Sequence, residues 1–201
     1  MDILVTLGRT LGFSMAAGVN LYATVAILGL ASRYGWVALP EQFRVFDHDL
    51  VIYAAAALFV VEFVADKIPW FDSIWDGVHT AIRPLGGALI AVTTLGDASP
   101  AVQGMVALLG GSMAASSHLA KAGTRVTVNA SPEPFSNWAL SLGEDVFVFA
   151  LAALALQFPL AALVVVSVAF VAFVGIIVML ARSLRRRFRR PPAVLPSGQP
   201  A

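Results

Sequence analysis

Long apolar runs separated by short polar breaks dominate the chain. The clearest run extends from Leu160 to Ala181 with Ser167 as its only polar residue, and it is long enough to cross roughly 30 Å of hydrocarbon at about 1.5 Å per residue. The breaks between runs coincide with clusters of glycine and proline. The pattern predicts helices at about Leu4–Ser32, Leu50–Ala65, Phe71–Leu95, Ala101–Lys121, Phe135–Leu156 and Leu160–Arg182.

These segments predict an all-α integral membrane protein. We expect a compact bundle of about six transmembrane helices in one domain over residues 1–182, with two helices broken or re-entrant. The composition agrees, since 59% of residues are hydrophobic, 12% are charged and the mean hydropathy is +0.83. The chain has no cysteine, which excludes disulfides and thiolate metal sites. Asp2 stands where a signal peptide has basic residues, so the first run is expected to be a retained helix.

The basic residues predict the orientation. A cluster directly follows the last run: Arg182, Arg185, Arg186, Arg187, Arg189 and Arg190. Such a cluster stays cytoplasmic and contacts anionic lipid rather than nucleic acid. With six spans the N-terminus is then cytoplasmic too, which predicts a multi-pass protein of the cell (inner) membrane. Residues 183–201 are predicted to form a disordered, basic and proline-rich cytoplasmic tail.

The most informative polar positions lie in the third predicted helix. Asp72, Asp76, His79 and Arg83 are spaced 4, 3 and 4 residues apart and therefore share one helix face. At mid-membrane the two aspartates and the arginine together cost roughly 7–10 kcal/mol, and the apolar residues that follow recover only about 2–4 kcal/mol. We therefore expect this stripe to face a protein interior or a wet cavity.

An alternative places the stripe in the headgroup region. In that interpretation residues 71–83 lie at the membrane surface and only the later part of the helix spans. The aromatic residues Trp70, Phe71 and Trp75 support it, because such side chains gather at membrane interfaces.

Two carboxylates end the preceding helix. Glu62 and Asp66 are four residues apart, so they either form a proton or metal-ion site or are neutralised by Lys67, Arg83 or Lys121. Oxygen-only ligation by Glu62, Asp66, Asp72 and Asp76 would favour Mg²⁺, Ca²⁺ or Mn²⁺. We expect no other cofactor; a divalent cation or a proton is the candidate coupling ion.

The second half of the chain carries polar positions with similar spacing. His118, Lys121 and Arg125 form a cationic stripe. The acidic and amide residues that follow are Asn137, Glu144 and Asp145, with Ser141 between them. Because buried charges are usually paired, mutual pairing of the acidic and basic stripes is the economical interpretation.

Two further patterns suggest irregular helices. Residues 68–73 and 131–138 both combine proline, aromatic and capping residues, as at helix starts placed within a membrane. Residues 14–21 also align with residues 112–119, which sets Asn20 opposite His118 and suggests a weak inverted repeat. The two proline-containing starts precede helices that run in the same direction, so the repeat is not a clean one.

Several of these segments occur together in a known family. The motifs are Gly18 to Thr24, Ala65 to Ser73, Trp75 to Thr80, Ile82 to Pro84, Lys121 to Arg125 and Asn129 to Asn137. Over roughly residues 10–160 the chain resembles the membrane family described as domain of unknown function 4126. The resemblance implies a small polytopic membrane protein whose family motifs are these polar positions, and it supplies no catalytic residues.

The leading hypothesis is a transporter or channel-like protein for a small solute or ion. In it the carboxylates Glu62, Asp66, Asp72, Asp76 and Glu144 carry protons or cations, His79 and His118 are relays, and Arg83, Lys121 and Arg125 are counter-charges. The alternatives are a membrane-embedded enzyme acting on a lipid-linked or phosphorylated substrate, and a structural or assembly subunit of a membrane complex. A homo-oligomer is compatible with each. A water-accessible cavity that reaches the stripe would favour the first two.

Overall fold

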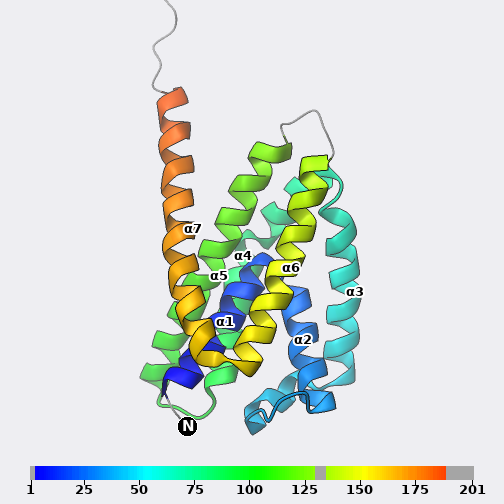
Figure 1. The fold of residues 1–201 in the computed structure, drawn as a ribbon, viewed down its shortest axis with the longest axis vertical. Helices are drawn as coiled ribbons and strands as arrows, with labels where there is room; N and C mark the ends of the chain where they lie inside the picture. Colours follow the sequence, from blue (N-terminus) through cyan, green and yellow to red (C-terminus); the bar gives the residue numbers. More distant parts are fainter. Residues whose placement is uncertain (1–2, 130–134, 189–201) are drawn as a thin grey trace, which may run out of the picture.

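The computed structural model describes residues 3–129 and 135–188, and every regular element in these ranges is a helix (Figure 1). The elements are α1 Ile3–Val19, α2 Leu21–Tyr34, a 3-10 helix η1 Glu41–Phe46, α3 Asp49–Ala65, α4 Pro69–Leu95, α5 Pro100–Asn129, α6 Phe135–Gln157 and α7 Pro159–Phe188. The predicted all-helical class is therefore confirmed. Residues 131–134 of the second proline-containing start lie outside the described residues.

The first predicted helix, Leu4–Ser32, is wrong as a single span. The chain breaks at Asn20, which has extended backbone angles (φ −147°, ψ 100°) and whose side-chain oxygen accepts a hydrogen bond from the Ala23 N–H at 2.9 Å. Asparagine is a favoured N-cap because its side chain satisfies an otherwise unpaired amide of the first turn. The two halves fold back on each other, so α1 and α2 form a helical hairpin whose tip lies inside the bundle (Figure 1).

This break also changes the proposed repeat. Residues 14–21 contain the hairpin tip, whereas residues 112–119 lie in the middle of the continuous helix α5. The two segments thus have different backbone structures. The predicted helix start at Pro69 is present, and Pro69 opens α4 in a first-turn position that proline tolerates.

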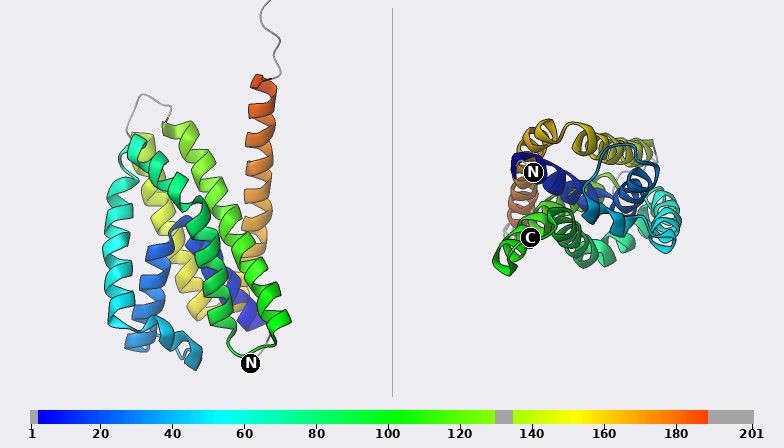
Figure 2. Two further views of the ribbon diagram at one scale, coloured as in Figure 1. Left: turned by 180° about the vertical axis from the view of Figure 1, so that it is seen from behind. Right: turned by 90° about the horizontal axis from the view of Figure 1, so that it is seen from below.

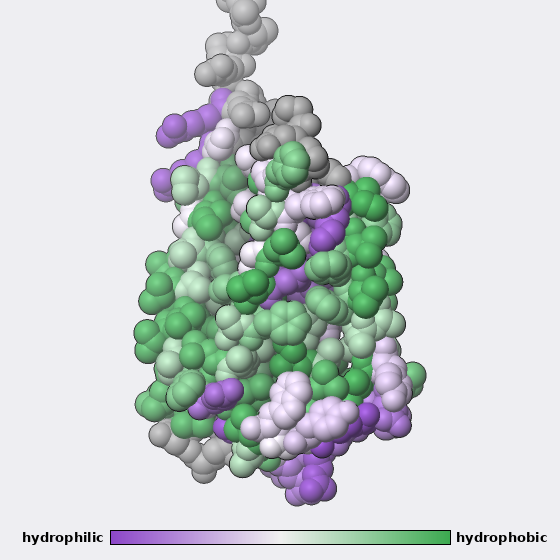
Figure 3. Space-filling model, turned by 45° about the vertical axis from the view of Figure 1, so that its right-hand side comes forward, coloured by the Kyte–Doolittle hydropathy of each residue, from purple (hydrophilic) through white to green (hydrophobic). Residues whose placement is uncertain are grey.

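Three helices are long and apolar enough to cross a membrane: Trp70–Leu95 in α4, Phe135–Gln157 in α6 and Pro159–Ser183 in α7. These helices indicate a membrane protein, and six spans of this kind are not found in the part of the chain that the structure describes. The side of the molecule in Figure 3 is largely apolar between its two more polar ends. Helix α7 is the most exposed of the three, since only 6% of its most apolar stretch is buried inside the protein. It continues to Phe188, so residues 183–188 of the predicted disordered tail are helical, and the rest of that tail lies outside the described residues.

The hairpin is held by small residues. Seen from below, α1 lies between α4 and α5 on one side and α6 and α7 on the other (Figure 2). The Ser14 hydroxyl donates to the Gly87 carbonyl oxygen of α4 at 3.0 Å, and the Ser117 hydroxyl of α5 donates to the Met15 carbonyl oxygen at 2.8 Å. A Cβ at Gly18 would overlap the Ala114 carbonyl group of α5. Small side chains thus let the backbones of α1, α4 and α5 approach closely.

The ends of the bundle differ in what they carry. One end, here the η1 end, holds the start of α1, the end of α2 and η1; the other, the α3–α4 end, holds the α3–α4 turn and the last turns of α7 (Figure 1). The start of α1 and the end of α7 are therefore at opposite ends. This does not fit the expectation that both termini lie on one side, and the physical reason is the hairpin, which returns the chain to the end from which it entered.

An ion-pair cluster ties the η1 end together. The Arg33 guanidinium, at the end of α2, contacts Asp47 and Asp49, each at 2.7 Å. The hydrogen bond to Asp47 raises the pKa of Arg33, so the cation persists at any pH at which the protein folds. These contacts fix η1 across the mouth of the hairpin.

Candidate functional site: a buried charge cluster at the hairpin tip

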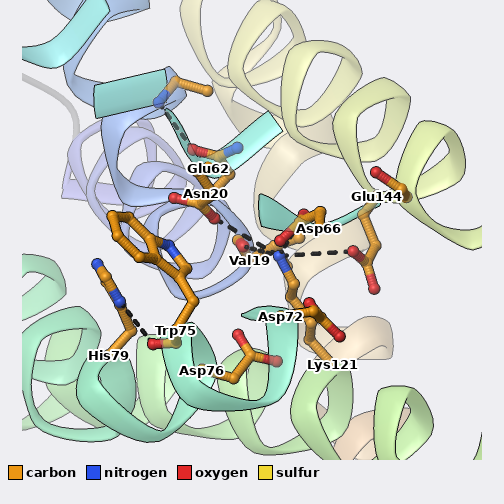
Figure 4. Close-up of polar contacts among 12 residues, drawn as sticks. Val19, Asn20, Glu62, Asp66, Asp72, Trp75, Asp76, His79, Lys121 and Glu144 are labelled. Carbon is orange, nitrogen blue, oxygen red and sulfur yellow. Dashed lines mark hydrogen bonds and ion pairs between the residues drawn. The ribbon is translucent and has the colours of Figure 1, made fainter. Parts of the chain in front are cut away.

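The hairpin tip meets a group of ionisable side chains from four other helices, here called the charge cluster. Its members come from α3 and its C-cap, α4, α5 and α6, and they are Glu62, Asp66, Asp72, Asp76, His79, Arg83, His118, Lys121, Arg125, Glu144 and Asp145. With Glu144 excepted, none is more than 8% exposed, and the Glu144 side chain is 11% exposed. The carboxylates converge from different helices on the Lys121 ammonium group (Figure 4). Charges at this depth must be neutralised by their neighbours.

Helix α4 places its stripe toward the interior. Its polar residues Asp72, Asp76, His79 and Arg83 are all at most 4% exposed. The opposite face carries exposed apolar residues at helical spacing, namely Trp70, Ile74, Val78, Ile82, Leu85 and Leu89. The stripe and the apolar segment that follows it form one uninterrupted helix, in which Arg83 lies about 21 Å from Pro69. The stripe thus extends from the N-terminal end of α4 to its midpoint and faces the protein interior. This agrees with the prediction made from the free-energy cost of exposing these charges to lipid.

Arg83 links α3, α4, α5 and the hairpin. Its Nη2 lies 2.6 Å from Glu62 Oε1 and its Nη1 lies 3.1 Å from Asp76 Oδ1. The same Nη1 donates to His118 Nδ1 at 2.8 Å and to the Gly18 carbonyl oxygen at 3.5 Å. Gly18 is in the last turn of α1, where carbonyl oxygens lack helical partners and the helix dipole favours a cation.

Lys121 occupies the centre of the cluster. Its Nζ lies 3.0 Å from Asp66 Oδ2 and 3.5 Å from both Glu62 Oε1 and Glu144 Oε2. It also donates to the Val19 carbonyl oxygen at 3.3 Å (Figure 4). One ammonium group therefore serves three carboxylates and the end of α1.

Arg125 closes the cluster on the side of α6. Its Nη2 contacts Glu144 Oε2 at 2.5 Å and Asp66 Oδ2 at 3.3 Å. Its Nη1 donates to Asn137 Oδ1 and to the Asp66 carbonyl oxygen, both at 2.8 Å, and lies 3.9 Å from Asp72 Oδ1. The Asn137 amide donates back to the same Asp66 carbonyl at 3.1 Å. This arrangement fixes the end of α3 against α5 and α6.

The two buried histidines carry their ring proton on different nitrogen atoms. Because arginine is only a donor, His118 Nδ1 must be the unprotonated acceptor, and its Nε2–H then donates to Thr80 Oγ1 at 3.1 Å. A second proton on His118 would face the Arg83 guanidinium. His79 Nδ1 donates to the Trp75 carbonyl at 2.7 Å, and its Nε2 lies 2.8 Å from the Tyr22 hydroxyl, which can accept or donate.

Acidic groups outnumber cations in the cluster. Six carboxyl groups (Glu62, Asp66, Asp72, Asp76, Glu144 and Asp145) face three permanent cations (Arg83, Lys121 and Arg125). Buried oxygen atoms on four of them have no hydrogen-bond partner among the described residues: Glu62 Oε2, Asp66 Oδ1, Asp76 Oδ2 and Asp145 Oδ2. Such atoms are costly unless protons, water or a cation satisfy them. The residues that the structure describes contain no group of three or more histidine or acidic side chains arranged to hold a metal ion, so the predicted divalent site has no support in the geometry.

Two cavities reach the edges of the cluster. One of about 270 Å³ lies between α5, α6 and α7 and touches Lys121 and Glu144. Another of about 360 Å³ lies between α2, α3 and α4 and touches Tyr22, the partner of His79. Apolar side chains line most of both cavities; the first touches two members of the cluster, and the second touches only Tyr22.

Sequence reasoning collected most of these residues but missed three contributors. The carbonyl oxygens of Gly18 and Val19 are free to accept hydrogen bonds from Arg83 and Lys121 only because α1 ends there. Tyr22 reaches His79 only because α2 turns back. The helix-breaking and capping properties of Asn20 were the available signal. Asn20 itself lies at the tip, is 1% exposed and contacts Asp145 of the cluster.

The helices and the buried charge cluster together identify the chain as an all-helical membrane protein. The family model described as domain of unknown function (DUF4126) matches residues 7–182, so the chain belongs to that family and the suspected resemblance is confirmed. No curated protein and no solved structure matches the chain.

Proposed function

We propose that this protein moves a small solute or ion across the cell membrane and couples that movement to protonation or cation binding in the charge cluster. The observation that carries the proposal is the surplus of carboxyl groups over cations at a hairpin tip inside the bundle. Pairing with three cations neutralises only part of this charge, and an ionised carboxylate without a partner is strongly disfavoured at low dielectric. The remaining groups must take up protons or cations, and groups of that kind mark ion pathways in membrane proteins.

The hairpin supports the same proposal. Transporters with broken helices use unpaired backbone groups at half-helix ends to hold ions and substrates near the middle of the membrane. Here the end of α1 contacts Arg83 and Lys121 through the Gly18 and Val19 carbonyls, and the start of α2 carries Asn20 and Tyr22. A movement of the tip would therefore change the surroundings of several charges at once.

The orientation in the membrane follows from the basic residues. Lys67, Arg182, Arg185 and Arg186 belong to the α3–α4 end. The η1 end carries fewer loop cations, Arg33 and Arg44, and both are ion-paired with acidic residues there. By the positive-inside rule the α3–α4 end is cytoplasmic. In the proposed topology the C-terminus lies inside, as the basic cluster predicts, and the N-terminus lies outside, contrary to the six-span expectation.

The three cations weigh against the enzyme alternative. A phosphate-binding role needs arginine or lysine donors free to contact the substrate. Arg83, Lys121 and Arg125 each already contact at least two carboxylates. The proposal therefore assigns them to charge neutralisation.

Flux through reconstituted protein tests the proposal. K⁺-loaded proteoliposomes containing a trapped pH dye are diluted into K⁺-free buffer with valinomycin. The efflux of K⁺ makes the interior negative and drives protons inward, and the assay is run alone and with Na⁺, phosphate or acetate gradients. We expect a pH change faster than in empty liposomes for at least one probe, and at least a tenfold slower change in Glu62→Gln and Asp76→Asn variants. Glu41→Gln, at an exposed residue of η1, is the control and should keep the wild-type rate. Folded protein that moves none of these probes, or variants as fast as wild type, would contradict the proposal and favour a structural subunit.

A further inference from the structure

Asp145 differs from the other carboxyl groups of the cluster. Glu62, Asp66, Asp72, Asp76 and Glu144 each lie within 4.0 Å of an arginine or lysine nitrogen. Among the described residues Asp145 forms no ion pair, although its residue is only 8% exposed. Its one hydrogen bond comes from the Asn20 amide to Oδ1 at 3.5 Å, and Oδ2 has no partner.

The position of Asn20 explains why this single contact matters. Its side-chain oxygen is used to cap α2 by accepting from the Ala23 N–H, which leaves only the amide nitrogen to face Asp145. The same residue thus holds the start of α2 and the carboxyl group. A proton on Asp145 changes the carboxyl from an acceptor of the Asn20 amide into a group that can also donate.

Charged groups surround Asp145 without pairing with it. Those that face it from neighbouring elements are Asp66 at the end of α3, Lys67 in the α3–α4 turn and Lys121 of α5, with Glu144 beside it on α6. The two acids oppose its ionisation and the two cations favour it. The cations are committed elsewhere, since Lys121 contacts three other carboxylates and Lys67 lies 3.1 Å from the centre of the Phe63 ring. Among the described residues, Asp145 is therefore the carboxyl group of the cluster that has no cation as a direct partner.

A path leads to Asp145 from the α3–α4 end. Lys67 is partly exposed there, donates to the Phe63 carbonyl oxygen at 2.9 Å and reaches Ser141 Oγ of α6 at 3.4 Å. Ser141 is one helical turn before Asp145 on the same face of α6. Hydrophilic side chains are visible within the otherwise apolar side of the molecule in Figure 3. Lys67, Ser141 and Asp145 thus form a polar series from the end of the bundle to the hairpin tip.

We infer that Asp145 is the carboxyl group that exchanges a proton, and that its protonation state is transmitted to the α1–α2 hairpin through Asn20. The inference rests on the proposed function, because it names the coupling site of the same cluster. The chemistry involves only transfer of H⁺ between water entering at the α3–α4 end and the Asp145 carboxylate. Release by the same path or toward the hairpin completes the exchange.

Infrared difference spectroscopy of the reconstituted protein tests this without measuring transport. Lowering the pH from about 9 to about 5 should produce a carbonyl-stretch band of a protonated carboxylic acid, which Asp145→Asn should remove. The variant is isosteric, and the amide oxygen introduced there can still accept from Asn20. Asp97→Asn, at an exposed residue outside the charge cluster, is the control and should keep the band. A band that survives in Asp145→Asn, or an Asp145-dependent band that ignores pH, overturns the inference.

A second variant examines the link to the hairpin. Asn20→Ser keeps an oxygen that can cap α2 but removes the amide donor, so the midpoint of the Asp145 band should rise by up to about one pH unit. An unchanged midpoint would show that Asn20 does not sense Asp145 and would overturn the coupling. The two proposals fail separately. An exchangeable Asp145 proton with no flux contradicts the proposed function, whereas flux that Asp145→Asn leaves unchanged contradicts the inference.

Discussion

Arg83 contacts four parts of the protein through one guanidinium group. Its planar fork reaches Glu62, Asp76 and His118 at once, and it approaches the end of α1 as well. Lysine would supply the charge without the fork. A fully buried arginine in the middle of a helix is tolerated here because its two terminal nitrogens contact carboxylates. Each ion pair neutralises a buried cation and a buried anion together.

Removing this side chain should destabilise the protein severely. Arg83→Met leaves the Glu62 and Asp76 carboxylates buried beside an apolar group, and breaking a buried pair in this way costs about 3–5 kcal/mol. Thermal unfolding in detergent, followed by circular dichroism, should show the loss. Arg44→Met is the matched control, because the Arg44 side chain is 79% exposed and its pair with Glu41 is at the surface. Equal unfolding temperatures for the two variants would contradict the assignment of Arg83 as a structural hub.

The α4 stripe and the hairpin show what the sequence can and cannot predict at the level of elements. The 4, 3 and 4 spacing of the stripe is local information, and it correctly places Asp72 to Arg83 on one buried face. The break at Asn20 depends on distant residues, since small side chains on α4 and α5 make room for the tip. The capping preference of Asn20 is a signal for a break, but within an apolar run it does not by itself decide between a break and a polar position in a continuous helix.

Partners within the charge cluster were unpredictable for the same reason. Helical spacing shows which residues share a face, but not which faces meet. The contacts of Lys121 with Asp66 and of Asn20 with Asp145 join positions 55 and 125 residues apart. The presence of acidic stripes and a basic stripe in one small bundle predicted that ion pairs would form. That Asp145 has no cation as a partner became clear only when the carboxylate partners of Arg83, Lys121 and Arg125 were known.

Close packing of helices α4 and α5 predicts different effects for two glycines of the same helix. A Cβ at Gly110 would overlap Ala91 Cβ and approach the Gly87 carbonyl oxygen at 2.9 Å, so Gly110→Ala should cost about 1–3 kcal/mol. Gly104 has open space, and Gly104→Ala should be neutral or stabilise by up to about 1 kcal/mol through helix propensity. Chemical denaturation in detergent measures both. If Gly110→Ala proves as stable as Gly104→Ala, the helices are less closely packed than described.

At the scale of the whole molecule, the hairpin decides which ends face which side. The chain has no cysteine, so single-cysteine variants need no altered background. With intact vesicles, a membrane-impermeant maleimide should label Ile3→Cys and Trp36→Cys from one side and Ser183→Cys from the other, because α1 and α2 enter and leave at the η1 end. Labelling of Ile3→Cys and Ser183→Cys from the same side would restore the six-span topology.

The order of the elements has a consequence for biogenesis. The hairpin is synthesised before every helix that surrounds it, yet it carries Thr10, Ser14 and Asn20, whose polar groups bond to Thr94, Gly87 and Asp145 much later in the chain. A growing chain that ends before α6 therefore presents an unfinished polar tip to the translocon. The hairpin can therefore reach its final position only after the later helices α4 and α6 have been synthesised.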